Sequence, residues 1–580
     1  MESGAERAAA GDALRRGDLL AACDLAASGL RREPDCAALQ YIRILALARM
    51  GHWRAALADY QASGLALSPD LSHRALLGRL LKDKAATLSA AERRAGFAAA
   101  GEAYRALYLE SGDPYPGINA ATLAVVAGAP AAGREIAREV LSHPATCLDD
   151  DYFAVATRAE ALLVTGDGAG AAAALREAAA LREPHDGARA STIRQFRLLL
   201  ESLPEAGPAL EPALDMLRPP PVLTYCGHMF RADFVEEARL QARISEVLDR
   251  LEPSIAYGSL ACGGDIMVAE ALLARGAELN VVLPFDDATF IERSVRGGGD
   301  PWLARFARCR DAARSVTYAT DTEFVGDRGQ YRFGQLLAMG LARLRAAPTG
   351  ADAVQFAVWD GRGLEADAGT GAEVRQWRAS GGETIAVDPG PIDRRCGQRQ
   401  PAGDRPRRAL CAILFADFAG FSRLREADLP AFASEVLGRV SAVLRGHGDA
   451  IRARNTWGDG VFVILTSCAA AAAAASELQS ALEAMDHAAL QADGGGMRIS
   501  LHFGPVYEAE DPVTGSPTFF GREVTRAARI EPVTPVGGVY LTQPFAAMLA
   551  MEAPGRFPCT YLGRVELAKG FATMPMYSLG

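Results

Sequence analysis

Two aspartates in the C-terminal part of the chain stand where carboxylates can do chemistry. Asp417 ends an apolar run at 409–416, and Asp459 lies beside glycines in Asn455-Thr456-Trp457-Gly458-Asp459-Gly460. Their separation of about forty residues matches a strand, a long helix and a returning strand. Two carboxylates brought together in this way can hold Mg²⁺ over a triphosphate, because this ion prefers one or two carboxylates plus phosphate oxygens. The C-terminal part is therefore predicted to process a nucleotide.

The elements that must position these aspartates are expected to form an α+β sandwich over residues 409–580. Alternating apolar runs predict the strands, and longer runs with helical periodicity predict the helices. In chain order we expect a strand at 409–415, a helix at 427–446, strands at 450–456 and 460–466, a helix at 468–490, a strand at 496–503, a helix beginning in 521–530, a strand at 538–542 and a closing hairpin at 558–579.

Ordered segments across residues 405–580 resemble the signature segments of class III nucleotidyl cyclases. The segments are 417–422, Trp457-Gly458-Asp459, 498–506, 520–530 and 567–570. The resemblance implies a ferredoxin-like α+β catalytic domain that converts an NTP into a 3′,5′-cyclic NMP and pyrophosphate. It also implies a homodimer with two equivalent sites, in which one subunit supplies the metal residues and the other an arginine.

The resemblance carries roles over to individual residues. Asp417 and Asp459, with the Phe418 carbonyl, would hold two Mg²⁺ or Mn²⁺ ions about 3.5–4 Å apart. Arg529 would stabilise the pentavalent transition state, and Lys569 and Arg498 would contact the triphosphate. The alternative without a catalytic role is that Asp417 and Asp459 are solvated carboxylates at strand ends and that Arg529 is a surface arginine. Backbone amides of a loop opening a helix would cradle the β- and γ-phosphates; this loop consists of Phe418, Ala419, Gly420, Phe421 and Ser422.

The expected base-reading positions depart from the family pattern. Cyclases acting on ATP or GTP carry a lysine or glutamate where this chain has Asn455, and the second base-reading position is Thr518. Asn455 can read O4 of uracil or N4 of cytosine, because its amide both donates and accepts. Trp457 faces the same side of the strand and would narrow the base pocket, stack on the base or pack at an interface. These residues slightly favour UTP or CTP, as in the Pycsar pyrimidine cyclases of bacterial antiphage signalling.

A second departure concerns the residue that orients the ribose. Thr525 stands four residues before Arg529, where the family usually has asparagine. A hydroxyl can still hydrogen-bond the ribose, with shorter reach and fewer donors, and Arg526 on the next turn is a candidate to compensate. Three functions therefore stay open: a pyrimidine cyclase, an adenylate cyclase using ATP, and a catalytically weak nucleotide-binding sensor or scaffold.

Residues 222–388 alternate apolar strands with Gly-rich turns and helices. Strands are expected at 222–225, 254–257, 279–285 and 353–360, and this pattern predicts a Rossmann-like parallel sheet. The glycine turns at 226–228, 258–265 and 369–371 would meet at the carboxyl ends of the strands and suit a phosphate or nucleotide. The region resembles the SLOG superfamily, whose members bind or process nucleotides. A regulatory nucleotide site, a purely structural domain and a second catalytic activity remain open.

Residues 1–215 show helical periodicity with little strand signal. Gly17, Ala21 and Ala22 recur as Gly51, Ala55 and Ala56, an offset of 34 residues that is the period of tetratricopeptide (TPR) units. We expect a TPR-like helical solenoid that binds a partner or senses a signal, or else serves as a spacer. A Pro/Arg-rich linker at 389–408 is expected to join the middle domain to the catalytic one.

Bulk properties narrow the partners. The 580 residues carry a formal net charge of −10, which argues against broad nucleic-acid binding. Ten cysteines lie singly without metal-binding spacing, as in a reduced compartment. Residues 1–7 lack the apolar core of a signal peptide, and no long uncharged apolar stretch follows. We therefore expect a cytoplasmic protein without a membrane anchor, and a protein or nucleotide ligand for the first two domains.

Overall fold

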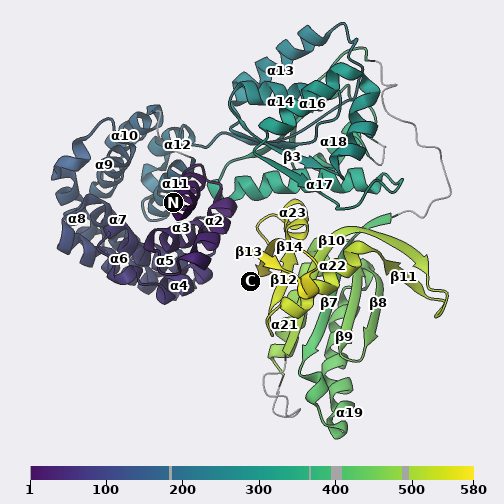
Figure 1. Ribbon diagram of the computed structural model, residues 1–580. Coiled ribbons are helices and arrows are strands. Elements are labelled where there is room, and N and C mark those ends of the chain that lie inside the picture. The colour runs from purple at the N-terminus through teal and green to yellow at the C-terminus, as the bar shows by residue number, and fades with distance from the viewer. Residues whose placement is uncertain (1, 182–185, 365–367, 393–407, 486–495) are drawn as a thin grey trace. The chain divides into compact units, whose positions relative to one another are not determined.

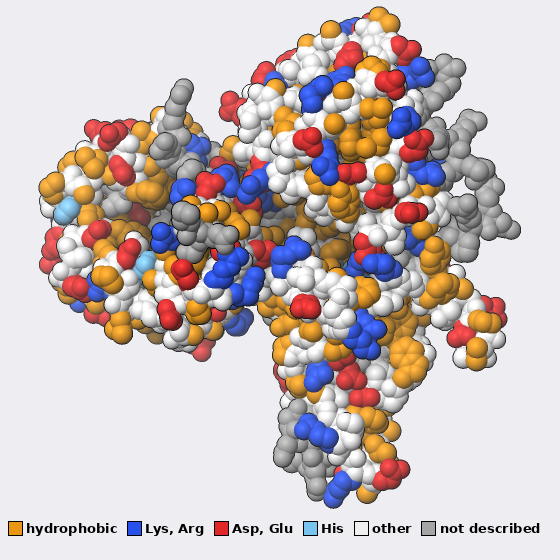
Figure 2. Space-filling model, in the orientation of Figure 1, with side chains coloured by type: hydrophobic (Ala, Val, Ile, Leu, Met, Phe, Trp, Pro, Cys, Tyr) orange, Lys and Arg blue, Asp and Glu red, His pale blue; other side chains and the backbone are white. Residues whose placement is uncertain are grey.

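The computed structural model describes residues 2–181, 186–364, 368–392, 408–485 and 496–580 of the chain (Figure 1). The chain forms two compact units, one of residues 1–219 with 348–351 and one of residues 220–347 with 352–580. None of the helices in the described residues is long and apolar enough to cross a membrane. Acidic and basic side chains are interspersed over the face of the described residues that Figure 2 shows.

The first unit consists of helices that curve round on themselves in Figure 1. Its helices are α1 (Glu2–Arg15), α2 (Leu19–Arg32), α3 (Ala37–Arg49), α4 (Trp53–Ala62), α5 (Leu71–Ala86), α6 (Ala90–Ser111), α7 (Pro114–Val126), α8 (Pro130–Ser142), α9 (Tyr152–Thr165), α10 (Gly168–Ala180), α11 (Asp186–Leu200) and α12 (Gly207–Asp215). Helices α1 to α10 pack on their neighbours in sequence, as expected of a helical repeat array, whereas α10 also packs on α12 and α11 contacts α7.

The sequence encodes several of the helix–helix turns by a Gly-Asp pair. In Gly17-Asp18, Gly112-Asp113 and Gly166-Asp167 the glycine has positive φ (72°, 68° and 99°), which only glycine adopts without strain. Each aspartate then accepts a hydrogen bond from an amide in the first turn of the next helix. Gly51 also has positive φ, and Ala22 and Ala56 are fully buried, so the 34-residue echo reflects equivalent positions in two helix pairs.

Helix α11 is tied to several other helices of this unit by polar side chains. The Gln195 amide donates to Glu160 of α9 at 2.7 Å, and the ammonium of Lys82 on α5 donates to Gln195 at 2.8 Å. Glu160 also accepts from the Thr122 hydroxyl of α7. Burial raises the pKa of Glu160 and lowers that of Lys82 to about 8, so these groups are costly to leave unpaired. The unit therefore has a polar buried layer as well as an alanine-rich core.

The middle region contains a six-stranded parallel sheet in the order β4-β3-β2-β1-β5-β6. The strands are β1 (Val222–Gly227), β2 (Ile255–Gly258), β3 (Glu278–Leu283), β4 (Ser315–Tyr318), β5 (Ala353–Val358) and β6 (Glu383–Val387). The helices are α13 (Glu237–Leu251), α14 (Gly264–Ala274), α15 (Asp287–Phe290), α16 (Asp300–Ala312), α17 (Gly329–Ala346) and α18 (Thr370–Ala379). A parallel sheet was predicted here, but its edge strands β4 and β6 were not.

The burial of each strand explains which strands could be predicted from the sequence. Every residue of β1 is buried, whereas β4 has no buried residue and only Val387 of β6 is buried. A central parallel strand covered on both faces reads as a continuous apolar run, whereas a short edge strand does not. The chain order reverses at β1, which lies between β2 and β5, and ligands of such sheets bind outside the carboxyl ends at this point.

The C-terminal region is an eight-stranded sheet with helices packed on it, ordered β13-β14-β12-β10-β7-β9-β8, with β11 paired to β10. The strands are β7 (Arg408–Ala419), β8 (Ile451–Trp457), β9 (Gly460–Leu465), β10 (Gly496–Glu510), β11 (Pro517–Phe520), β12 (Val539–Thr542), β13 (Cys559–Glu566) and β14 (Thr573–Leu579). The helices are α19 (Leu429–Phe432), α20 (Gly438–Gly446), α21 (Cys468–Glu483), α22 (Arg522–Ile530) and α23 (Gln543–Glu552).

Some expected elements differ from this arrangement. The helix predicted at 427–446 is interrupted by a π-helical turn at Ala433–Leu437, which separates α19 from α20. Helix α21 ends at Glu483, and residues 486–490 of its predicted range lie outside the described residues, as do residues 393–407 of the predicted linker. Helix α23 and strand β11 were not predicted. Helix α23 follows β12 without any intervening loop, so no turn signal marks it.

Candidate active site

The two predicted aspartates meet at the end of a strand pair. Strands β7 and β9 are antiparallel neighbours, with Ala416 opposite Val461. Asp417 follows Ala416, and Asp459 occupies the tight turn between β8 and β9, where Gly458 has φ 65°. Burial, reinforced by the charge of Asp417 and a hydrogen bond to it, raises the pKa of Asp459 to about 6. The two carboxyl groups therefore lie close enough for the charge of Asp417 to act on Asp459.

The loop after β7 approaches the aspartates with its backbone. Gly420 has φ 95°, a conformation that costs glycine little, and a single 3₁₀ turn follows at Phe421–Arg423. The Phe418 ring is buried against Phe432 at 5.3 Å between centroids, and the Phe421 ring packs on Phe432 at 4.9 Å. These aromatic anchors fix the loop while its peptide groups stay near Asp417. The expected helix directly behind the loop is this short turn instead.

Arg498 lies next to Asp417 but engages another carboxylate. It is the cross-strand partner of Asp417 in the β7–β10 pair, and its guanidinium lies 3.7 Å from Glu531. Burial and the charge of Asp417 raise the pKa of Glu531 to about 7, against the lowering effect of Arg498. Sequence analysis missed Glu531, because a glutamate just after a helix normally faces solvent. The contact proposed from Arg498 to triphosphate would compete with this ion pair.

Helix α22 presents Thr525 and Arg529 on one face, four residues apart. The Thr525 hydroxyl is exposed and lies 3.4 Å from the Gly521 carbonyl. Arg529 is partly exposed and has no ion-pair partner among the described residues. Arg526 is buried and bound to Glu523 at 2.6 Å and to Asp321 at 3.0 Å. It is therefore committed elsewhere, and the suggestion that Arg526 compensates for Thr525 is wrong.

The expected base-reading residues lie on edge elements of the sheet. Asn455 and Trp457 are exposed on β8, and the Trp457 indole stacks on Phe462 at 6.1 Å between centroids. Trp457 keeps 58% of its surface exposed, which is high for so large an apolar side chain. The Asn455 side chain accepts a hydrogen bond from the Thr456 amide at 2.8 Å. Thr518 is on β11, opposite Ala509 of β10.

Lys569 stands in the turn of the β13–β14 hairpin in a strained conformation. Its φ is 63°, and only one other non-glycine residue of the described chain, Glu252, has positive φ. Such strain costs on the order of 1 kcal/mol and tends to occur at functional positions. The side chain is exposed. Among the described residues, no ion pair joins Lys569 or Arg529 to the two aspartates.

Comparison with known proteins agrees with this geometry. The family described as "Adenylate and Guanylate cyclase catalytic domain" matches residues 405–580, and the family described as "Tetratricopeptide Repeats-Sensor" matches residues 18–124. Residues 405–580 form a class III nucleotidyl cyclase domain. The first helical unit contains a TPR sensor domain.

Solved cyclase structures also align with the cyclase domain. The guanylate cyclase domain of RhGC from Catenaria anguillulae, in complex with GTP, is 20% identical over 30% of this chain and 96% of its own length, with a TM-score of 0.26. The adenylyl cyclase CyaB from P. aeruginosa is 19% identical over 30% and 96%, with a TM-score of 0.26. A Trypanosoma brucei adenylate cyclase is 23% identical over 29% and 87%, with a TM-score of 0.24. No curated protein matches the chain.

Class III cyclase domains use divalent metal ions, and the two carboxyl groups fit such an ion. Burial raises the pKa of Asp459, and the adjacent charge of Asp417 raises it further. A divalent cation offsets these charges and still leaves coordination positions for phosphate oxygens. No group of three or more His, Cys, Asp or Glu side chains in the described residues is arranged to hold a metal. The site would therefore depend on the nucleotide to complete the coordination.

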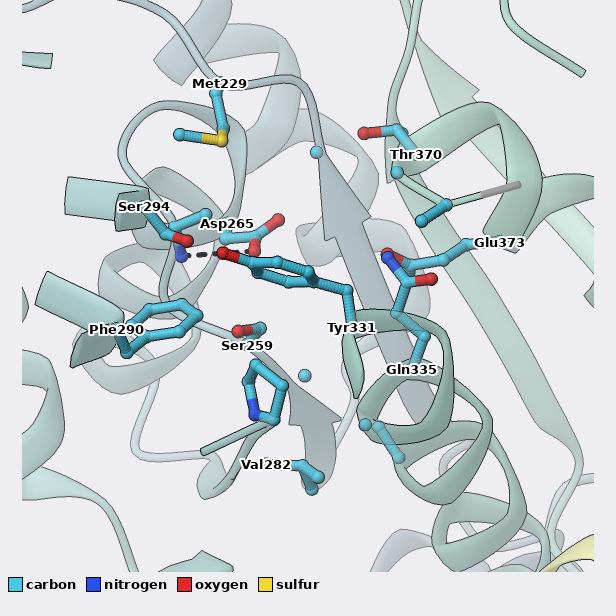
Figure 3. A pocket seen from close by; sticks show the side chains of 18 of the residues that line it. Met229, Ser259, Asp265, Val282, Phe290, Ser294, Tyr331, Gln335, Thr370 and Glu373 are labelled. Carbon is cyan, nitrogen blue, oxygen red and sulfur yellow. Dashed lines mark hydrogen bonds between the residues drawn. The ribbon is translucent and has the colours of Figure 1, made fainter. Parts of the chain in front are cut away.

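The middle domain contains a pocket of about 360 Å³ at the carboxyl ends of its strands (Figure 3). The three predicted glycine turns meet here: Gly227 ends β1 and His228 follows it, Gly258 ends β2 and Ser259 follows it, and Gly369 and Thr370 open α18. Helix α17 supplies another wall. The convergence of these turns makes the pocket the second candidate site of the protein.

Two acidic side chains face this pocket. Asp265 is 6% exposed and Glu373 is half-buried, and Figure 3 shows them on opposite sides of the Tyr331 ring. Burial raises the pKa of Asp265 to about 7 and that of Glu373 well above its usual range. The Asp265 Oδ2 accepts from the Ala261 amide at 3.2 Å, while Oδ1 has no hydrogen-bond partner among the described residues. A ligand offering hydroxyl or amino groups would satisfy this buried oxygen.

The raised pKa of Asp265 predicts a pH-dependent stability. The folded chain retains the proton up to about pH 7, whereas the unfolded chain loses it near 3.8, so stability falls as pH rises through this window. Asp265→Asn should remove that loss, which between pH 5 and pH 8 is about 3 kcal/mol at about 1.4 kcal/mol per pKa unit. Urea unfolding at pH 5 and pH 8 measures it. The exposed Asp311→Asn is the control, and a variant slope equal to the wild-type slope would contradict the expectation.

Proposed function

We propose that the protein converts a nucleoside triphosphate into a 3′,5′-cyclic mononucleotide and pyrophosphate in a homodimer. The observation that carries this proposal is the pair of carboxyl groups, Asp417 and Asp459, held together beside the glycine loop at 418–422. Metal ions held there would lower the pKa of the ribose 3′-hydroxyl and neutralise the leaving pyrophosphate.

The chain's own residues would perform the remaining tasks. The peptide amides at 418–422 would orient the β- and γ-phosphates, and Lys569 would add a positive charge to them. Arg529, unpaired within the described residues, would bind the equatorial oxygens of the α-phosphate as charge accumulates there. Thr525 would hold the ribose one turn earlier on the same helix. Because Arg529 has no ion pair to the aspartates of its own chain, the proposed site joins Arg529 of one subunit to Asp417 of the other.

We propose that the base of the substrate is a pyrimidine, so that the substrate is UTP or CTP. An exposed Trp457 beside Asn455 on the edge strand β8 supports it, since the indole would limit the space for a base and the amide would read its polar edge. With this substrate we also propose a physiological role in antiphage signalling, which the resemblance to the Pycsar cyclases suggests. ATP is the alternative substrate.

A second candidate function is nucleotide binding without turnover. The observation that favours it is Thr525, whose hydroxyl is turned toward the Gly521 carbonyl of its own helix rather than free to meet a ribose. Incubating the full-length protein with each of the four NTPs and Mn²⁺, followed by mass spectrometry, separates the two functions. A cyclic product identifies an enzyme and its base. Tight binding of an NTP that is recovered unchanged identifies a sensor.

Trp457 gives a specific prediction about base choice. Trp457→Ala should enlarge the base site and raise the purine-to-pyrimidine ratio of kcat/KM by about tenfold, the range that one large apolar contact supplies. Initial rates with UTP, CTP, ATP and GTP measure the ratio. Thr456→Ala is the matched control, because its side chain points to the other face of β8. An unchanged ratio in the Trp457 variant would assign the indole to interface packing instead.

The pocket of the middle domain is proposed to bind a nucleotide as a regulatory ligand. Its place at the carboxyl ends of β1 and β2, two helix N-termini and the unsatisfied Asp265 oxygen support a ligand with both phosphate and hydroxyl groups. Arg293 and Arg328 line the same pocket and would offset phosphate charge. We also propose that the middle domain belongs to the SLOG-like domains that bind nucleotides.

A further inference from the structure

The loop that follows β4 of the middle domain makes an ion pair with the catalytic helix. Asp321 in this loop accepts from Arg522 of α22 at 2.7 Å and from Arg526 at 3.0 Å. Asp321 and α22 belong to the same compact unit although about two hundred residues separate them. Both arginines lie within one turn of Thr525. The middle domain therefore holds the helix that carries the proposed ribose and transition-state contacts.

Inside the cyclase domain the same helix is fixed by a buried chain of hydrogen bonds. Arg526 donates to Glu523 at 2.6 Å, Glu523 contacts the His502 ring at 2.7 Å, and the other nitrogen of that ring meets the Thr542 hydroxyl at 2.8 Å. These side chains are almost fully buried, with Glu523 at 4% and His502 at 0% exposure. Such a network specifies one orientation of α22 about its axis. Asp321 is its outer end and is 42% exposed.

The loop at 319–328 is itself attached to the wall of the pocket. The buried Gln330 side chain accepts from the Val325 amide at 3.0 Å and donates to the Glu323 carbonyl at 3.1 Å. The Phe324 ring packs on Tyr331 at 5.6 Å and under the Arg293 guanidinium at 3.9 Å. Tyr331 and Arg293 both line the pocket. A ligand that moves either side chain therefore acts directly on the loop that carries Asp321.

Helix α17 strengthens the same connection. One face lines the pocket through Tyr331, and the other packs on α23 of the cyclase domain. At Gly340 a Cβ would lie 2.4 Å from the Ala547 carbonyl oxygen, so the two helices are in backbone contact. The Arg343 guanidinium donates to the Ala550 carbonyl at 3.3 Å. Packed helices of this kind shift as units rather than bend.

We propose that Asp321 is a positioning residue for cyclase turnover, and that the loop at 319–328 relays occupancy of the pocket to Arg529. This rests on the proposed function of the cyclase domain and extends it to regulation. Arg526 and Arg529 are three residues apart, so the rotation of α22 that seats Arg526 on Asp321 also sets the direction of Arg529. A small displacement of a charge that acts at the transition state is costly in rate. Neutralising Asp321 releases the outer end of the network.

The test uses full-length Asp321→Asn. Because Arg526 retains its ion pair with Glu523, the variant should fold, with the thermal midpoint and the dimer mass of the wild type. Its kcat should fall by about tenfold with KM unchanged, since positioning for the transition state is lost while ground-state binding is kept. Asp321→Glu should recover most of the rate. Asp249→Asn, which breaks a 2.6 Å ion pair to Arg275 elsewhere in the same domain, is the matched control and should retain full activity.

Several outcomes would overturn the proposal. A wild-type kcat in Asp321→Asn would do so, and so would an equal loss in Asp249→Asn. Phe324→Ala, which leaves Asp321 in place but removes the packing on Tyr331, should also lower kcat, and full activity there would refute the relay from the pocket. Hydrogen exchange of the α22 amides separates this idea from the proposed function. If wild type makes no product, faster exchange in Asp321→Asn still supports positioning, and equal exchange refutes it.

Discussion

Replacing Asp417 by Asn should lower the production of cyclic nucleotide by on the order of 10³-fold, because one of two neighbouring metal-binding carboxylates becomes neutral. The amide keeps the volume and most of the hydrogen bonding of the carboxyl group, so β7 should fold as before. Removing the neighbouring charge should also lower the pKa of Asp459, since Asp417 is one of the causes that raise it. Initial rates with Mn²⁺ and the preferred NTP measure the loss.

The matched control is Asp449→Asn, an exposed carboxylate of the same domain. It should keep wild-type activity, and both variants should keep the wild-type thermal midpoint. Retained activity in Asp417→Asn, with the control also active, would mean that the catalytic site lies elsewhere. A loss of stability together with activity would require Asp417→Glu as a second variant, in which the restored charge should recover part of the rate.

The carboxylate pair was accessible to sequence reasoning because each of its determinants is local. Asp417 lies near the end of an apolar strand, and a glycine turn that can adopt positive φ places Asp459 between the two strands of the next hairpin. The antiparallel pairing of β7 with β9 then brings the two together, and that pairing follows from two apolar strands with the right intervening length. The Gly-Asp turns of the helical unit were equally local. Features of this kind depend on residues that are adjacent in the sequence, so a local pattern predicts them.

The remaining parts of the site depend on contacts between distant segments. Glu531 acquires a pKa of about 7 only because the fold buries it near Asp417, and Asp321 reaches Arg526 only because α17 packs on α23. Asp265 and Glu373 become a pocket pair through the parallel sheet that aligns α14 with α18. In sequence each of them is an ordinary charged residue of a helix or a loop. Their roles arise from tertiary burial, which no local pattern encodes.

The same distinction explains the errors at element boundaries. The run at 427–446 has helical periodicity throughout, yet a π-helical turn interrupts it at Ala433–Leu437. In the first part of this run, Phe432 packs against Phe418 and Phe421 of the loop at 418–422. These aromatic contacts therefore influence the path of the helix together with the helix propensity of its residues. The π-helical turn begins directly after Phe432, next to this aromatic packing.

A mixed dimer of Asp417→Asn and Arg529→Ala chains should recover about half of the wild-type activity per dimer, although each variant alone should be nearly inactive. In the proposed homodimer one site of the mixed species combines the intact Asp417 of one chain with the intact Arg529 of the other, and the second site lacks both. Co-expression with two different tags and sequential purification yields this species. Its rate with Mn²⁺ and NTP is then compared with doubly tagged wild type prepared in the same way.

This expectation follows from the shared site that the resemblance to class III cyclases implies, and the surroundings of Arg529 are compatible with it. Arg529 is partly exposed, has no carboxylate partner among the described residues, and shares its face of α22 with Thr525. A cation held in this way can serve a phosphate presented from outside the chain. A doubly tagged Asp417→Asn homodimer controls for contaminating wild type and should stay inactive. If the mixed dimer were as inactive as its parents, Asp417 and Arg529 would have to act within one subunit, and the proposal of two shared sites would be wrong even if turnover itself were real.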